Sequence, residues 1–191
     1  MFPVFQLTET PTIISKGQFG ASLLVELSYS HEGLEQWLTQ LSKPYPLILA
    51  DADWLLRSPD IVKLLIERNI PVGLLGESNE NYLNNDGLLE KHLAIFQKTF
   101  QQQPLWFATR DYLIDEALQQ TLYALEINLI APTYSINDTQ KKFAEGDFIS
   151  IPLHREETIS FEELNQFIKA HTFITIEQNL LGYNFSTKRY P

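Results

Sequence analysis

The chain of 191 residues contains no cysteine. This absence excludes disulfide scaffolds, thiolate zinc sites, thiol nucleophiles and iron–sulfur clusters. No apolar run reaches the roughly 18 residues that a membrane-spanning helix needs, so we expect no membrane insertion. The N-terminal residues also lack the basic segment and apolar core of a secretory signal peptide. We therefore expect a soluble chain that is cytoplasmic by default, and extracytoplasmic only if an upstream leader has been removed.

Several common motifs of enzymatic sites are also missing. The sequence contains no G-x-G-x-x-G segment, no Walker pattern and no G-x-S-x-G nucleophile elbow. No histidine lies three to five residues from another, so no single helix or turn supplies the usual pair of metal-binding imidazoles. The four histidines are His31, His92, His154 and His171. Because His92 lies among apolar residues of an expected helix, we interpret it as a packing residue.

The charge balance argues against polyanionic partners. The sequence has 14 Lys and Arg against 24 Asp and Glu, which gives a formal net charge of −10. A chain this acidic repels nucleic acids and anionic membrane surfaces. The 44% hydrophobic residues are typical of a globular protein, and at 22.1 kDa we expect one domain.

Short apolar runs alternate with segments of helical periodicity along most of the chain. Such alternation predicts βα units and a parallel sheet, which forms either an open doubly wound fold or a barrel. We expect an irregular lead-in over residues 1–20, a single α/β domain over 21–191, and a polar loop over 77–87. The expected strands are residues 21–27, 47–50, 70–75, 105–107, 127–131, 148–153 and 173–176.

In a parallel α/β fold, catalytic and ligand-binding residues lie at the carboxyl ends of the strands, an edge that we call the mouth. His154 ends one expected strand and is interpreted either as a general acid or ligand-contacting group, or as a surface histidine in a turn. Asp51 and Asp53 follow another strand. They either join His154 in a divalent metal site, for example for zinc, or bond loop amides and cap the helix near Trp54.

Aromatic side chains near the expected mouth suggest a second kind of site. Aromatic rings match the apolar faces of sugars, so these residues are candidates for a stacking platform with a neighbouring cation. For the cluster over residues 106–112, the alternative is that Trp106 and Phe107 fill the core and that Arg110 forms a surface pair with Asp111. The substrate-binding candidates are Tyr29, Trp54, Arg110, Tyr112 and Tyr134.

Four segments resemble the polysaccharide deacetylases, the NodB homology domain of carbohydrate esterase family 4. The segment 47–65, L-I-L-A-D-A-D-W-L-L-R-S-P-D-I-V-K-L-L, resembles the family's second strand and helix. The segments 104–107 (P-L-W-F), 146–151 (G-D-F-I-S-I), and 160–164 with 173–177 resemble later parts of the family pattern. The resemblance covers about residues 21–177 and implies a distorted (β/α) barrel of about seven parallel strands.

The family's catalytic motifs are replaced at the matching positions. Ser28 and Tyr29 stand where the resemblance implies a base aspartate and a metal-binding aspartate. Leu75 and Asn79 stand where it implies two metal-binding histidines, and Ala108 where it implies an arginine. The late histidine has one candidate, His154, about two residues beyond the expected position. Leu offers no lone pair and Ser, Tyr and Asn coordinate weakly, so the metal chemistry is not expected here.

Three functions remain open from the sequence. The first is a deacetylase-like domain without its metal cofactor or activity, which binds a glycan or a protein partner at its mouth. The second is a working hydrolase with a non-standard zinc-type site, in which His154 and Asp138 are the catalytic candidates; its full set is Asp51, Asp53, Asp111, Asp138 and His154. The third is a scaffold whose outer helices bind a protein. The sequence does not indicate the oligomeric state.

Overall fold

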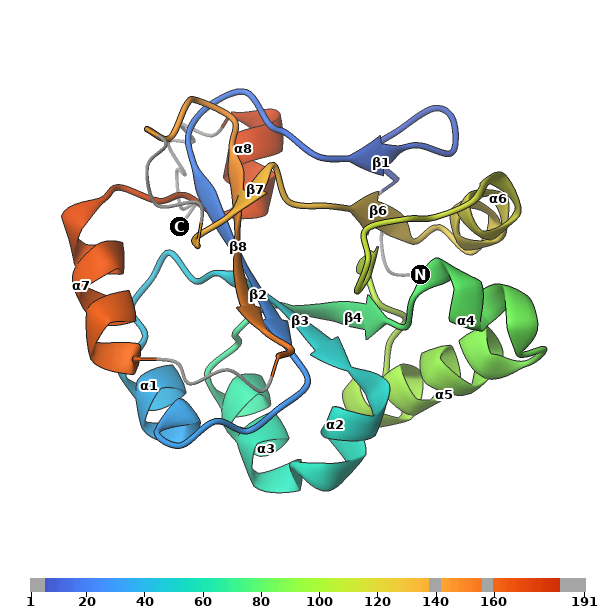
Figure 1. The fold of residues 1–191 in the computed structure, drawn as a ribbon, viewed down its shortest axis with the longest axis horizontal. Helices are drawn as coiled ribbons and strands as arrows, with labels where there is room; N and C mark the ends of the chain where they lie inside the picture. The colour runs from blue at the N-terminus through green and yellow to red at the C-terminus, as the bar shows by residue number, and fades with distance from the viewer. Residues whose placement is uncertain (1–5, 138–141, 156–159, 183–191) are drawn as a thin grey trace, which may run out of the picture.

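One parallel sheet organises the chain. The computed structural model describes residues 6–137, 142–155 and 160–182. Within them, eight strands pair in the order β1-β6-β5-β4-β3-β2-β8-β7, all in parallel, and the sheet curls into a half-barrel (Figure 1). The strands are β1 (Ile13–Ile14), β2 (Ser22–Leu27), β3 (Leu47–Asp51), β4 (Val72–Gly76), β5 (Trp106–Thr109), β6 (Asn128–Ile130), β7 (Tyr134–Ser135) and β8 (Phe148–Leu153).

The two faces of the sheet bury two different cores. Successive side chains of a strand point to opposite faces, so β2 sends Val25 and Leu27 into the core shared with the helices. Leu24, Leu49 and Leu75 lie in the other core, on what we call the inner face. Every residue of β2 and β8 is buried, as expected for central strands of a covered parallel sheet.

Helices surround the sheet, as Figure 1 shows. Asp51, Ser78, Asp115 and Ser160 each accept a backbone N–H at the start of a helix, which satisfies an otherwise unpaired donor. Within the described residues, no helix has both the length and the apolar character needed to cross a bilayer. The helices are α1 (Leu34–Gln40), α2 (Ala52–Arg57), α3 (Pro59–Glu67), α4 (Asn79–Asn84), α5 (Leu88–Phe100), α6 (Glu116–Ala124), α7 (Phe161–Ala170) and α8 (Ile176–Leu181).

This architecture confirms the α/β class and the curled barrel of parallel strands, and it corrects three local expectations. The lead-in is not wholly irregular, because β1 pairs with β6 at the edge of the sheet. The polar segment 77–87 contains helix α4, which Ser78 caps. The expected last strand forms only one bridge, from Phe173 to Ala21, because the capping box of Thr175 and Gln178 starts α8 there instead.

We predict that the inner core below the mouth stabilises the fold strongly. Leu49 is fully buried beside Glu26 in the sheet register, so Leu49→Ala should lower the free energy of unfolding by about 2–5 kcal/mol. The matched control Leu56→Ala, at a side chain 60% exposed, should change it by no more than about 0.5 kcal/mol. Urea denaturation followed by circular dichroism measures both, and equal effects would contradict this account of the core.

Candidate functional site

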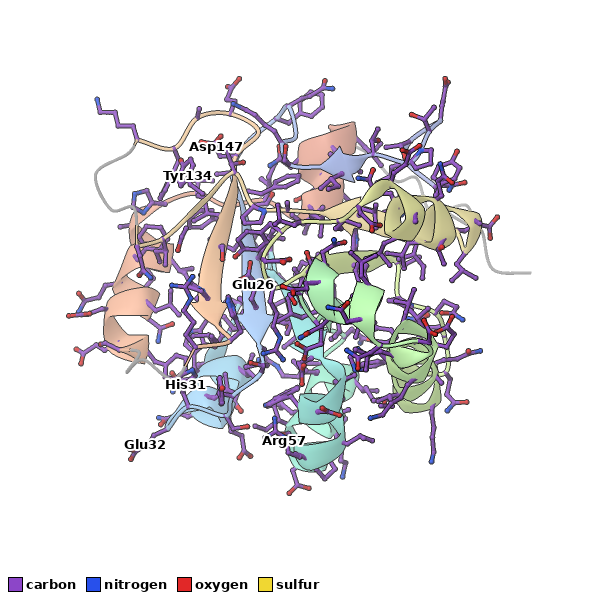
Figure 2. All side chains as sticks on the ribbon, turned by 45° about the vertical axis from the view of Figure 1, so that its right-hand side comes forward. Glu26, His31, Glu32, Arg57, Tyr134 and Asp147 are labelled. Atoms are coloured by element: carbon purple, nitrogen blue, oxygen red, sulfur yellow. The ribbon has the colours of Figure 1, made fainter. Side chains whose placement is uncertain are left out.

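Glu26 is a carboxylate enclosed in the inner face near the mouth. Because Leu24 and Glu26 are two residues apart on β2, Glu26 points to the inner face together with Leu24. Glu26 is fully buried, and Figure 2 shows it deep among the strands. A buried carboxylate is costly unless partners compensate it, so its contacts define the chemistry of this region.

Two side chains from distant segments compensate Glu26. The Tyr112 hydroxyl donates to its carboxylate, at 2.6 Å from Oε1 and 2.7 Å from Oε2. The Nδ1 atom of His154, directly after β8, lies 2.9 Å from Oε2, although the ring N–H direction is off the hydrogen-bond line. The cluster therefore joins β2, β8 and the loop after β5 at one point.

Tyr112 holds its place at a conformational cost. Its φ of 58° lies in the left-handed region, which costs a non-glycine residue roughly 1–2 kcal/mol. Its backbone N–H donates to the carbonyl of Thr109, which closes the turn after β5. Burial raises the pKa of the Tyr112 hydroxyl, and the neighbouring Glu26 charge raises that pKa further. Tyr112 is therefore a permanent donor to Glu26 at physiological pH.

A second charged cluster lies at the ends of β3, β4 and β5. The Arg110 guanidinium contacts Asp51 Oδ2 at 2.5 Å and Glu77 Oε1 at 3.4 Å. The other carboxylate oxygen of Asp51 accepts the N–H of Trp54 at 2.8 Å and caps α2. A cation that belongs to the chain thus neutralises these carboxylates.

The proposed metal ligands do not converge around a common point. Asp51 binds Arg110 and His154 contacts Glu26, whereas the side chain of Asp53 is exposed. Among residues 6–137, 142–155 and 160–182, no three His, Asp or Glu side chains are arranged to hold a metal ion. These donors therefore do not fit the divalent ion that the resemblance implies. Asp138, the other catalytic candidate, lies outside the described residues.

The residues that replace the family motifs have other roles. The hydroxyl of buried Ser28 donates to the backbone carbonyl of His154 at 3.3 Å. Leu75 and Ala108 are packed in the inner core. Asn79 begins α4: its N–H donates to the carboxylate of Asp111, and its Oδ1 accepts the N–H of Asp115. These contacts fasten loops around the mouth.

The aromatic candidates divide into two groups. Tyr29 and Tyr112, together with Arg110, are half-buried on segments that follow β2 and β5 at the mouth. Trp54 is only 1% exposed and its indole N–H donates to Ser30, so its ring has no free face for a sugar. Tyr134 does not join the mouth.

Tyr134 lies near the opposite end of the sheet. Its hydroxyl donates to Asp147, the residue before β8, at 2.8 Å, and Figure 2 shows this pair far from His31. Burial opposes the ionisation of Asp147, but the N–H of Ala144, the Tyr134 hydroxyl and the Lys16 ammonium outweigh it and lower the pKa of Asp147. This pair fastens the amino end of β8.

Sequence reasoning did not single out Glu26 and Glu77 as site residues. A detectable signal was present for Glu26, because a carboxylate inside an apolar strand must have a buried partner. Glu77 lay in a segment interpreted as a polar loop, where a charge carries no such signal. Their partners come from segments far apart in sequence, so the pairing required the fold.

A hydrogen-bonded support lies behind Glu77. The Tyr82 hydroxyl contacts His92 Nδ1 at 2.9 Å and accepts the N–H of Glu77 at 3.1 Å. His92 is 3% exposed on α5, in agreement with its interpretation as a packing residue. Burial lowers the pKa of His92, against the opposing pull of Asp51 and other carboxylates.

The curled parallel sheet and its helices define the polysaccharide deacetylase fold. A carbohydrate esterase family 4 pseudoenzyme from Bacillus anthracis aligns with 89% of this chain and 69% of its own length, at a TM-score of 0.69 and 14% identity. A family 4 carbohydrate esterase from Bacillus subtilis covers 88% of this chain and 85% of its own, at a TM-score of 0.68 and 11% identity.

A third structure supports the same fold. The chitin deacetylase from the fungal pathogen Colletotrichum lindemuthianum covers 91% of this chain and 93% of its own, at a TM-score of 0.68 and 12% identity. No protein-family profile and no curated protein sequence matches the chain. The resemblance noted in the sequence is therefore confirmed at the level of the fold.

We predict that Asp51 contributes more to stability than its neighbour Asp53. Asp51→Ala removes a helix cap and leaves Arg110 without its closest partner, so the free energy of unfolding should fall by about 2–3 kcal/mol. Asp53→Ala, at an exposed position on the same helix, should change it by less than about 0.5 kcal/mol. Denaturant titration distinguishes the two, and a loss at Asp53 as large as at Asp51 would disprove the assignment.

His92 should make stability depend on pH. In the unfolded chain this histidine titrates near its ordinary pKa of about 6.5, and in the folded chain at a lower pH. Between these two values the unfolded state binds more protons, so stability rises with pH through the interval and is lost as pH falls through it. His92→Gln should flatten this slope in urea titrations over the interval; an unchanged slope would exclude His92 as its source.

Proposed function

We propose that this chain is a glycan-binding domain with the deacetylase fold that does not carry out metal-dependent deacetylation. The observation that carries the proposal is the Arg110 guanidinium between Asp51 and Glu77. A carboxylate that already pairs with a guanidinium at 2.5 Å would have to break that pair before it could bind a metal ion. The hydrolysis implied by the family resemblance needs such an ion to polarise the carbonyl and to activate water.

The groups at the mouth suit a hydroxyl-rich ligand. Tyr29 and Tyr112 are half-buried, as are Arg110 and Glu77, so each has surface left for a ligand. Tyrosine rings offer flat amphipathic surfaces, and the charged groups form strong hydrogen bonds with hydroxyls. The net charge of −10 disfavours polyanionic ligands, and a chitin deacetylase with the same fold acts on a glycan.

A hydrolase is the second candidate, and one observation favours it. His154 lies against the buried carboxylate of Glu26, and a histidine oriented by a carboxylate is the usual arrangement for proton transfer in hydrolysis. This candidate predicts release of acetate from an acetylated glycan, with or without added zinc.

Calorimetric titration with a chitin oligosaccharide tests the binding. Tyr29→Ala should weaken binding about 3- to 10-fold, because a stacked aromatic contact contributes about 0.5–1.5 kcal/mol. Tyr134→Ala, at the far end of the sheet, is the matched control and should leave the affinity unchanged. Equal losses in both variants, or no binding by the wild type, would argue against a glycan site at the mouth.

Metal analysis of the same protein distinguishes the two candidates. We expect substoichiometric zinc after purification and no acetate release from acetylated glycans. One tightly bound metal ion per chain together with acetate release would replace the binding proposal with the hydrolase. Acetate release without bound metal would point to His154 and Glu26 alone.

A further inference from the structure

The contact between Glu26 and His154 places a histidine ring against a buried carboxylate at the mouth. Glu26 is fully buried, and its carboxylate accepts the Tyr112 hydroxyl at both oxygens. The side chain of His154 is 9% exposed, and its Nδ1 lies 2.9 Å from Glu26 Oε2. The three side chains therefore form one closed cluster below the mouth.

The chemistry of the carboxylate selects one tautomer of the histidine. An ionised carboxylate only accepts hydrogen bonds, so its charge at 2.9 Å from Nδ1 favours a proton on that nitrogen over a lone pair, although the ring N–H direction is off the hydrogen-bond line. In the neutral imidazole, a proton on Nδ1 leaves a lone pair on Nε2. The carboxylate thus makes the other ring nitrogen an acceptor.

The second nitrogen of His154 is available to a ligand. Across the described part of the chain, no side chain or backbone group forms a hydrogen bond with Nε2, and this atom is not among the buried atoms that lack a partner. Ser28 holds the backbone of His154, because its hydroxyl donates to the His154 carbonyl. Nε2 is therefore a fixed acceptor that meets solvent or a ligand.

We propose that Glu26 is the positioning residue of this site, and that it holds the ring proton of His154 on Nδ1, so that Nε2 accepts from hydroxyl donors of the ligand. The ligand class rests on the proposed function: a sugar supplies many hydroxyl donors, and Arg110 at the same mouth supplies donors for its carbonyl or ring oxygens. The tautomer itself depends on nothing but the contact between Glu26 and His154.

The inference is tested by long-range ¹H–¹⁵N spectra of the labelled chain at neutral pH. We expect His154 to show a protonated Nδ1 and an unprotonated Nε2. In Glu26→Gln, the amide oxygen accepts the Tyr112 hydroxyl and the amide NH₂ donates to Nδ1, so the ring proton should move to Nε2. The signals of His92 and His171 in the same spectra serve as internal references and should not change.

Two results would overturn the inference. One is a wild-type His154 that is protonated at Nε2 or at both nitrogens, and the other is an unchanged tautomer in folded Glu26→Gln. If Glu26→Gln does not fold, the wild-type spectrum still decides, and Tyr112→Phe gives a second check. That variant keeps the carboxylate against the ring and should keep the wild-type tautomer; a proton moved to Nε2 would contradict the role of Glu26.

Binding of a chitin oligosaccharide separates this inference from the proposed function. Glu26→Gln should bind about tenfold more weakly than the wild type, because one hydrogen bond to the ligand is lost. An inverted tautomer with undiminished affinity would overturn the assignment of Nε2 as the ligand acceptor. No binding by the wild type, together with the expected tautomers, would reject the glycan function and leave the positioning role of Glu26 intact.

Discussion

The mouth depends on one electrostatic constraint: carboxylates that the sheet buries must find their compensating partners within the same chain. Glu26 on β2 and Asp51 on β3 are both shielded from water, and each alone would oppose folding. Tyr112 and His154 compensate the first, and Arg110 compensates the second. Because these partners follow β5 and β8, the two clusters join the ends of strands that are not neighbours in sequence.

The class of fold could be predicted because the sequence patterns that indicate it are local. Apolar runs with turn residues between them located the six long strands, and Asp115 and Ser160 marked helix starts that the structure shows as capped. The sequence pattern did not predict the two-residue strands β1 and β7, because these strands are defined only by their pairing with β6 and β8. Apolar residues around position 174 predict a strand, but the capping box at Thr175 starts a helix there. Apolar periodicity alone does not detect such a cap.

The contacts of the site were harder to predict, because they join residues that are far apart in the sequence. His154, Tyr112 and Arg110 were found as polar residues after strands, but their partners were not. Glu26 lies in an apolar strand, where the pattern predicts core residues. Tyr134 follows a strand, yet its hydroxyl contact lies at the other end of the sheet. Sequence position after a strand therefore indicates a region, whereas the identity of each partner depends on register and on loop conformation.

The place of β2 between β3 and β8 has a consequence for synthesis of the chain. Residues 22–27 leave the ribosome long before residue 148, so β2 waits with one edge unpaired and with Glu26 lacking His154. Exposed strand edges and uncovered apolar surface both favour association with other chains. The nascent chain is therefore vulnerable to aggregation until β8 docks, and completion of the sheet and completion of the mouth are the same event.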